Sequence, residues 1–171
     1  MAAKRARVRS APRHDHDAGG PAEILAAKAA VRREGDAVTV VAIGRMVKPA
    51  LAAAATLADE GVSAEVIDPR TLVPFDTDAV LASVAKTGHL VVVDEARECC
   101  SAASQIAAVV AEQGFALLKG PIRRVTTPNV AIPYAPNAEA HVIPGEARIA
   151  SAVRELLGRG GRPGRSEKVL A

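Results

Sequence analysis

Aromatic residues are almost absent from this sequence. It has two Phe, one Tyr and no Trp, so aromatics make up 2% of 171 residues although hydrophobic residues make up 49%. Ala and Val supply most of that hydrophobic share, so the core must be built from small and β-branched side chains, which suits helices packed closely on a sheet. The lack of stacking aromatics also argues against a nucleic-acid-binding protein.

Cysteine is equally scarce, and its placement excludes several classes of site. Cys99 and Cys100 are adjacent, so they cannot join distant parts of the fold, and there is no CxxC or Cys/His ligand spacing. We therefore expect a reduced, cytoplasmic setting and no metal ligands. No apolar run reaches the roughly 18 residues that a membrane span requires, and the N-terminus lacks a secretory h-region.

Positive charge is concentrated in the tails. The formal net charge is +3, but residues 36–157 carry ten Lys or Arg against fourteen Asp or Glu. We predict a disordered basic leader over 1–27, one domain over 28–157 and a disordered Gly- and Arg-rich tail over 158–171. An Arg-rich start is also typical of organelle transit peptides, but Asp15 and Asp17 argue against one here.

Apolar runs alternate with helical patterns along the predicted domain. We expect strands over 28–33, 38–43, 63–68, 89–94 and 122–126, and helices over 47–60, 76–87, 101–113 and 146–157. Gly35 is expected to take a positive φ in a tight turn after the first strand. Such alternation predicts a three-layer α/β/α sandwich with a mainly parallel sheet, in which only the first strand is antiparallel.

The carboxyl ends of these strands are the default ligand site of the fold class. They carry polar groups, namely Gly44-Arg45, Asp68-Pro69-Arg70, Asp94-Glu95 and Thr126-Thr127. These groups could bind a small molecule, or they could simply be the first polar positions after buried strands. Neither a G-x-G-x-x-G nor a P-loop motif occurs, so the sequence offers no nucleotide cradle.

Acidic and sulfur groups follow the 89–94 strand. Asp94 and Glu95 should point to opposite faces, which favours helix capping or an ion pair with an arginine over a paired-carboxylate mechanism. Cys99 and Cys100 precede a helix, whose dipole could lower a thiol pKa, but neither His89 nor His141 has a spacing that makes it a partner base. We therefore expect the cysteines to be small buried residues.

Three segments together resemble one family. GRMVKPALAAAATLADEGVSAEVIDPRTLVPFD, LASVAKTGHLVVVDEA and PIRRVTTPNVAIPYAP are similar to the C-terminal domain of the β subunit of thiamine-diphosphate-dependent 2-oxo acid dehydrogenases, the E1 component, a domain that also closes transketolase. The resemblance runs from about 28 to 157 and implies a mixed five-stranded sheet with an antiparallel first strand. RECCSAASQ looks nearer to acetoin-type than to pyruvate-type members.

The resemblance also implies partners. In the family, thiamine diphosphate and Mg²⁺ bind between a pyrimidine-binding domain and an E1 α subunit, while the C-terminal domain makes subunit contacts and faces the acyltransferase core. We see nothing like the pyrimidine-binding domain before Lys28, so this chain alone should bind no cofactor and catalyse nothing, and we assign no catalytic residues. The residues that we expect at interfaces are Arg45, Arg70, Glu95, Arg97, Lys119 and Tyr134.

Three hypotheses follow from the sequence. The first is a detached C-terminal domain of an E1 β-like subunit, acting in assembly and docking. The second is a stand-alone dimerisation or regulatory module, or a gene remnant. The third is an independent thiol-dependent enzyme at Cys99 or Cys100. Lys119 stands where many pyruvate-type members have an aspartate, which reverses the charge at an expected partner surface.

Overall fold

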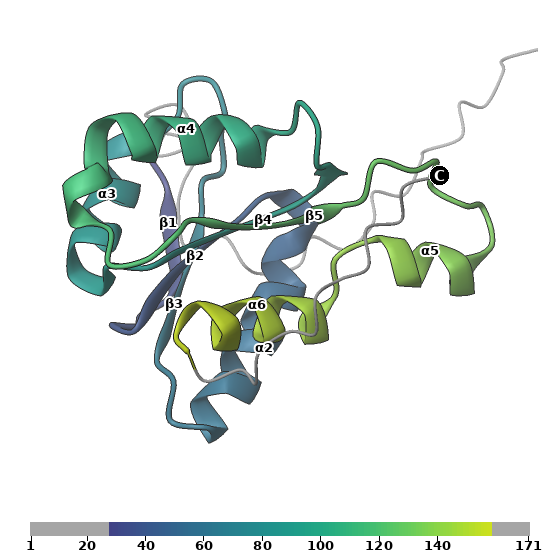
Figure 1. Ribbon diagram of the computed structural model, residues 1–171, viewed down its shortest axis with the longest axis horizontal. Coiled ribbons are helices and arrows are strands. Elements are labelled where there is room, and N and C mark those ends of the chain that lie inside the picture. Colours follow the sequence, from purple (N-terminus) through teal and green to yellow (C-terminus); the bar gives the residue numbers. More distant parts are fainter. Residues whose placement is uncertain (1–27, 159–171) are drawn as a thin grey trace, which may run out of the picture.

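The computed structural model describes residues 28–158, which form a three-layer α/β/α sandwich (Figure 1). The strands are β1 (Ala30–Arg33), β2 (Val38–Ala42), β3 (Ala64–Asp68), β4 (Leu90–Arg97) and β5 (Arg123–Thr127). The helices are α2 (Val47–Asp59), α3 (Thr77–Thr87), α4 (Ala102–Gly114), α5 (Pro136–Val142) and α6 (Glu146–Leu156). The leader predicted over 1–27, and the predicted tail beyond Gly158, lie outside the described residues.

The sheet has the order β1-β3-β2-β4-β5 and is parallel except at β1. β1 runs antiparallel to β3, with Ala30 opposite Asp68, so the predicted direction of the first strand is confirmed. Although a short turn joins β1 to β2, β3 lies between them in the sheet. From β2 the chain passes to β3 on one side of it. It then crosses to β4 on the other side of β2, with β5 beyond, so the strand order reverses at β2.

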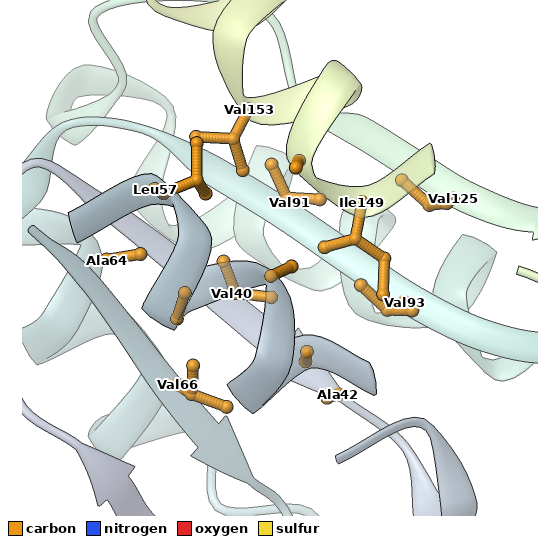
Figure 2. Close-up of a cluster of buried hydrophobic side chains, with 14 of the residues drawn as sticks. Val40, Ala42, Leu57, Ala64, Val66, Val91, Val93, Val125, Ile149 and Val153 are labelled. Carbon is orange, nitrogen blue, oxygen red and sulfur yellow. The ribbon is translucent and has the colours of Figure 1, made fainter. Parts of the chain in front are cut away.

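Alternate residues of the central strands enter two separate cores. Val40 and Val66 face α2 and α6, where Leu57 and Ile149 complete a cluster of small and branched side chains (Figure 2). Val41 faces the opposite cluster, under α3 and α4. Helices on both faces leave the central strands no solvent-facing side, which explains their mostly apolar sequence.

Helix termini follow the signals in the sequence. The Asp76 side chain accepts hydrogen bonds from the N–H of Ala79 at 3.2 Å and of Ala29 at 2.9 Å, so it caps α3 and also holds the segment before β1. Gly88 ends α3 with a φ of 77°. None of the helices within residues 28–158 is long and apolar enough to cross a bilayer.

The structure corrects three local predictions. Gly35 does not have a positive φ; a Cβ there would lie 2.3 Å from the carbonyl carbon of Ala64, so close backbone approach is what requires glycine. β4 continues to Arg97 rather than ending at Asp94. No helix was predicted between 126 and 146, but the structure has the short helix α5 there, which begins at Pro136.

Candidate functional site

An ion pair occupies the point where strand order reverses, at the carboxyl ends of β2 and β4. Arg45 follows β2 and Glu95 lies near the end of β4, with 2.9 Å between Nε and Oε2. Their side chains are 59% and 47% exposed, so water screens the pair and its net stabilisation is small. In this fold class the same position is the usual ligand crevice. Here two opposite charges neutralise one another in it.

Asp94 is the buried neighbour of Glu95 and organises the turn that follows β4. It is 4% exposed, its Oδ1 accepts a hydrogen bond from Ala96 N at 2.9 Å, and its Oδ2 accepts one from Ala103 N at 3.3 Å. The carboxylate therefore ties the strand end to the first turn of α4. Helix capping and an ion pair with an arginine were the two alternatives that the sequence favoured; Asp94 bonds the first turn of α4, and Glu95 pairs with Arg45.

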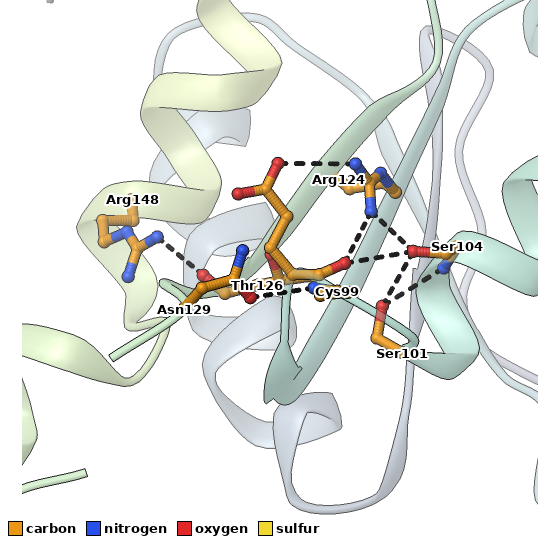
Figure 3. A network of polar contacts seen from close by, with 8 residues as sticks. Cys99, Ser101, Ser104, Arg124, Thr126, Asn129 and Arg148 are labelled. Carbon is orange, nitrogen blue, oxygen red and sulfur yellow. Dashed lines mark hydrogen bonds and ion pairs between the residues drawn. The ribbon is translucent and has the colours of Figure 1, made fainter. Parts of the chain in front are cut away.

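A polar network fixes the other side of this turn (Figure 3). Arg124 of β5 donates to the carbonyl of Glu98 at 3.0 Å and to Ser104 Oγ at 2.6 Å. Ser101 caps α4 by accepting from Ser104 N at 3.2 Å. Arg124 thus lies on the α4 side of the sheet, whereas Arg123 shares a face with Val125, which packs toward α6. Alternation along the strand separates the two arginines.

Cys99 and Cys100 lie at the tip of this turn, and both are exposed, so the prediction that they are buried is wrong. α4 begins at Ala102, two residues beyond the pair. A hydrogen bond with Cys100, together with the charge of that neighbour, raises the pKa of the Cys99 thiol above its ordinary value. This direction is opposite to the activation that a nucleophilic thiol at Cys99 would require.

Exposed apolar side chains follow β5 in residues 128–135, which we call the apolar segment. Val130 is 50% exposed, Ile132 46%, and Tyr134 is fully exposed. The segment is held near its start, where Asn129 Oδ1 accepts from Cys99 N at 3.0 Å (Figure 3). Arg148 donates to the carbonyl of Thr126, just before the segment, and to that of Val142 in α5. Three apolar side chains displayed on an anchored segment are typical of a contact surface.

A pocket of about 590 Å³ opens beside β2 and β3. Its charged lining residues are Arg32, Arg45, Lys48 and Asp68. Arg32 lies 3.4 Å from Asp68, and Arg45 pairs with Glu95, so carboxylates already balance both arginines. The pocket has no phosphate-binding glycine loop. Asp68 is its only carboxylate, so the lining offers no second one to bind a metal ion.

The six predicted interface residues do not form one surface. The carboxyl ends of β2 and β4 carry Arg45, Glu95 and Arg97. Along the chain, Arg70 follows the carboxyl end of β3 and Tyr134 comes after that of β5. Lys119 lies near the amino end of β4, at the opposite end of the strands. Its N–H donates to the carbonyl of Gly88, just before β4, at 2.8 Å. The predicted contacts therefore belong to two separate faces.

Sequence reasoning missed the residues that hold this edge together. Asn129, Ser104 and Arg148 act through hydrogen bonds between segments far apart in the chain. Only Ser101 had a local signal, since a serine directly before a run with helical periodicity is a common helix N-cap.

Comparison with known proteins places the domain. Residues 27–149 match the model of the transketolase C-terminal domain. The chain is 47% identical over 131 residues to the β subunit of acetoin:2,6-dichlorophenolindophenol oxidoreductase from Bacillus subtilis, covering 77% of this chain and 38% of that protein. It is 48% identical over 135 residues to the subunit of the same name from Cupriavidus necator, covering 79% and 40%.

Two further comparisons agree. The chain is 40% identical over 129 residues to the pyruvate dehydrogenase E1 β subunit of Rickettsia bellii, covering 75% of this chain and 40% of that one. The solved structure of a split gene transketolase, an inactive beta4 tetramer, superposes with a TM-score of 0.70 at 29% identity, over 79% of this chain and 44% of that chain. The chain spans about two fifths of the length of the curated relatives it matches. It belongs to the transketolase C-terminal domain family and is homologous to the C-terminal part of E1 β subunits.

Proposed function

We propose that this domain acts in subunit assembly and partner docking in an E1 β-like dehydrogenase, as a detached C-terminal domain that works with separately encoded cofactor-binding domains. Its partners would be an E1 α-type subunit, a chain bearing the pyrimidine-binding domain, and the acyltransferase core. The observation that carries the proposal is the apolar segment, which displays Val130, Ile132 and Tyr134 on an anchored backbone. One structural neighbour is a chain of a split gene transketolase, of which this domain covers 44%, so a protein with this domain can be divided between chains.

The described residues do not fit thiamine diphosphate with its magnesium ion. Over 28–158 there is no group of three or more metal-ligating side chains, and Asp68, the one carboxylate that lines the 590 Å³ pocket, lies against Arg32. Decarboxylation would therefore depend on cofactor domains supplied by the partners, and this domain would hold them together.

We propose a different kind of contact at each end of the strands. The apolar segment, at the carboxyl edge, would meet the E1 partners, because burying large apolar side chains is what stabilises permanent interfaces. Lys119 is exposed at the opposite edge and would meet the acyltransferase core, where contact is set by charge.

Reconstitution tests this proposal. The chain is mixed with an acetoin-type E1 α subunit and a chain carrying the pyrimidine-binding domain, and assembly and 2-oxo acid or acetoin turnover are measured with thiamine diphosphate and Mg²⁺. We expect a complex that is active only when all three chains are present. Lys119→Glu should leave that complex intact and change only binding to the acyltransferase core. No complex and no turnover over a range of concentrations would overturn the proposal.

Self-association is the second candidate, because the split gene transketolase that superposes on this domain is a tetramer of β chains. A stand-alone dimerisation module would associate through the same apolar segment without other proteins. Sedimentation of the chain alone decides between the two: a dimer at micromolar concentration favours the module, and a monomer that assembles only with partners favours the E1 role.

A further inference from the structure

Exposed apolar side chains gather at one end of the domain. Seven large hydrophobic side chains are exposed within residues 28–158, and five of them follow the carboxyl end of β3 or of β5. Three of the five belong to the apolar segment. The other two are Leu72, 44% exposed, and Val73, 92% exposed, in the loop after β3. Such a concentration marks an interaction site, and this one extends beyond the apolar segment.

Hydrogen bonds hold the loop that displays Val73. Asp68 Oδ1 accepts from Arg70 N at 3.0 Å, where the loop leaves β3. The Thr71 hydroxyl then donates to the carbonyl of Pro74 at 2.8 Å and closes the turn that contains Val73. A side chain presented on a fixed backbone loses less conformational freedom when a partner binds it. Val73 therefore has the properties of an interface anchor.

Sheet order sets the distance between the two apolar groups. β2 and β4 lie between β3 and β5, so three inter-strand spacings, about 14 Å in all, separate the two strand ends. The apolar segment alone is small for an interface. Its three exposed side chains supply at most about 250 Å² each, whereas a stable complex buries about 800 Å² on each partner. A partner that covers both groups also covers the ends of β2 and β4 between them.

A charged hollow lies in this intervening surface. The 590 Å³ pocket beside β2 and β3 is lined by Val47 and Leu51 as well as by Arg45 and Lys48. Glu95 neutralises Arg45, but the exposed Lys48 ammonium has no hydrogen-bond or ion-pair partner within 28–158. A partner's acidic side chain inserted here would bring its carboxylate to Lys48 and its methylene groups to the apolar lining. The complementary group is therefore an aspartate or a glutamate.

We propose that the carboxyl ends of β3, β2, β4 and β5 form one docking surface, in which Val73 and Tyr134 are apolar anchors and Lys48 binds an acidic side chain of the partner. The identity of that partner rests on the proposed function. It is the chain bearing the pyrimidine-binding domain, because this domain matches the C-terminal two fifths of its β-subunit relatives, in which the other three fifths continue in the same polypeptide. A neighbour that is permanent in the relatives favours an apolar, anchored surface.

Titration of the full chain with the pyrimidine-binding chain alone, measured by sedimentation, tests this surface. Val73→Ser and Lys48→Glu should each weaken association about tenfold. Phe115→Ser and Lys119→Glu are the matched controls, because these exposed side chains lie between α4 and β5, away from the carboxyl ends, and should leave affinity unchanged. The loss from Lys48→Glu should shrink as salt rises from about 0.05 to about 0.5 M, because salt screens exposed charges, whereas the loss from Val73→Ser should not.

The outcomes separate this inference from the proposed function. Association that neither Val73→Ser nor Lys48→Glu weakens, or that the two controls weaken as much, would overturn the docking surface and leave the assembly role standing. No association of the unaltered chain would overturn both. If the chain alone forms a dimer that Val73→Ser dissociates, the surface contacts a second copy and the proposed partner is wrong. Circular dichroism of each variant checks that the domain is folded.

Discussion

Replacing Asp94 by alanine should destabilise the domain far more than replacing its neighbour Glu95, although both are acids at the end of β4. Asp94 is buried and accepts from Ala96 N and Ala103 N. Its loss removes two hydrogen bonds to a charged acceptor, and at least one buried N–H is left without a partner. At about 1.5–3 kcal/mol for each such bond, discounted for the 3.3 Å length of the second, we expect about 3 kcal/mol.

Glu95→Ala is the matched comparison. It removes only the half-exposed pair with Arg45, so we expect a loss of about 0.5 kcal/mol. Asp94→Asn keeps one acceptor oxygen and should lie between the two. Urea unfolding at pH 7 measures all three, and Asp94→Ala should also lower the melting temperature by about 10 °C. Equal losses for Asp94→Ala and Glu95→Ala would refute the reasoning that one acid holds the turn and the other does not.

Three further substitutions test the interior. Leu57→Ala, at a side chain 1% exposed under α6, should cost about 3 kcal/mol in urea unfolding, and a loss below about 1 kcal/mol would contradict the packing in Figure 2. Thr39→Val should cost about 1–3 kcal/mol in the same assay, because the hydroxyls of Ser83 and Thr87 in α3 lose the Thr39 hydroxyl that lies 2.6 and 2.8 Å from them. A neutral result would show that these two hydroxyls find other partners. Burial alone would raise the pKa of Glu65, but its hydrogen bond with Lys86 and the charge of that ammonium lower it below 4.5. The stability from this carboxylate is therefore present above about pH 4.5 and is lost as pH falls through the lowered pKa. Lys86→Met should thus cost about 1–3 kcal/mol at pH 7 and progressively less as pH falls through the lowered pKa of Glu65, and a cost independent of pH would exclude this ion pair as its cause.

The layers of the fold were predictable because burial on both faces leaves a clear mark in the sequence. VTVVA is apolar at every position except Thr39, and glycines such as Gly88 end helices where a left-handed residue is needed. The alternation of side chains also predicted that Asp94 and Glu95 would separate. These inferences depend only on local geometry, which the order of residues determines directly.

Features that depend on distant segments were not predictable in the same way. β4 extends to Arg97 because that residue pairs with Thr127 of β5, which lies 30 positions away, and its polar sequence resembles a loop. Gly35 is required by the close approach of Ala64, which no local pattern reveals. Cys99 and Cys100 are exposed because the turn between β4 and α4 projects them into solvent, whereas cysteine composition alone favours burial.

The measurement that tests the assembly role most directly is a sedimentation titration of the chain with its E1-type partners, comparing Tyr134→Ser with Phe115→Ser. Both aromatic side chains are exposed, but Tyr134 lies in the apolar segment and Phe115 follows α4. If the apolar segment is the interface, Tyr134→Ser should weaken association about 10- to 30-fold, the effect of losing about 1.4–2 kcal/mol, and Phe115→Ser should leave it unchanged. Equal affinities for the two variants, or a larger loss from Phe115→Ser, would contradict the account.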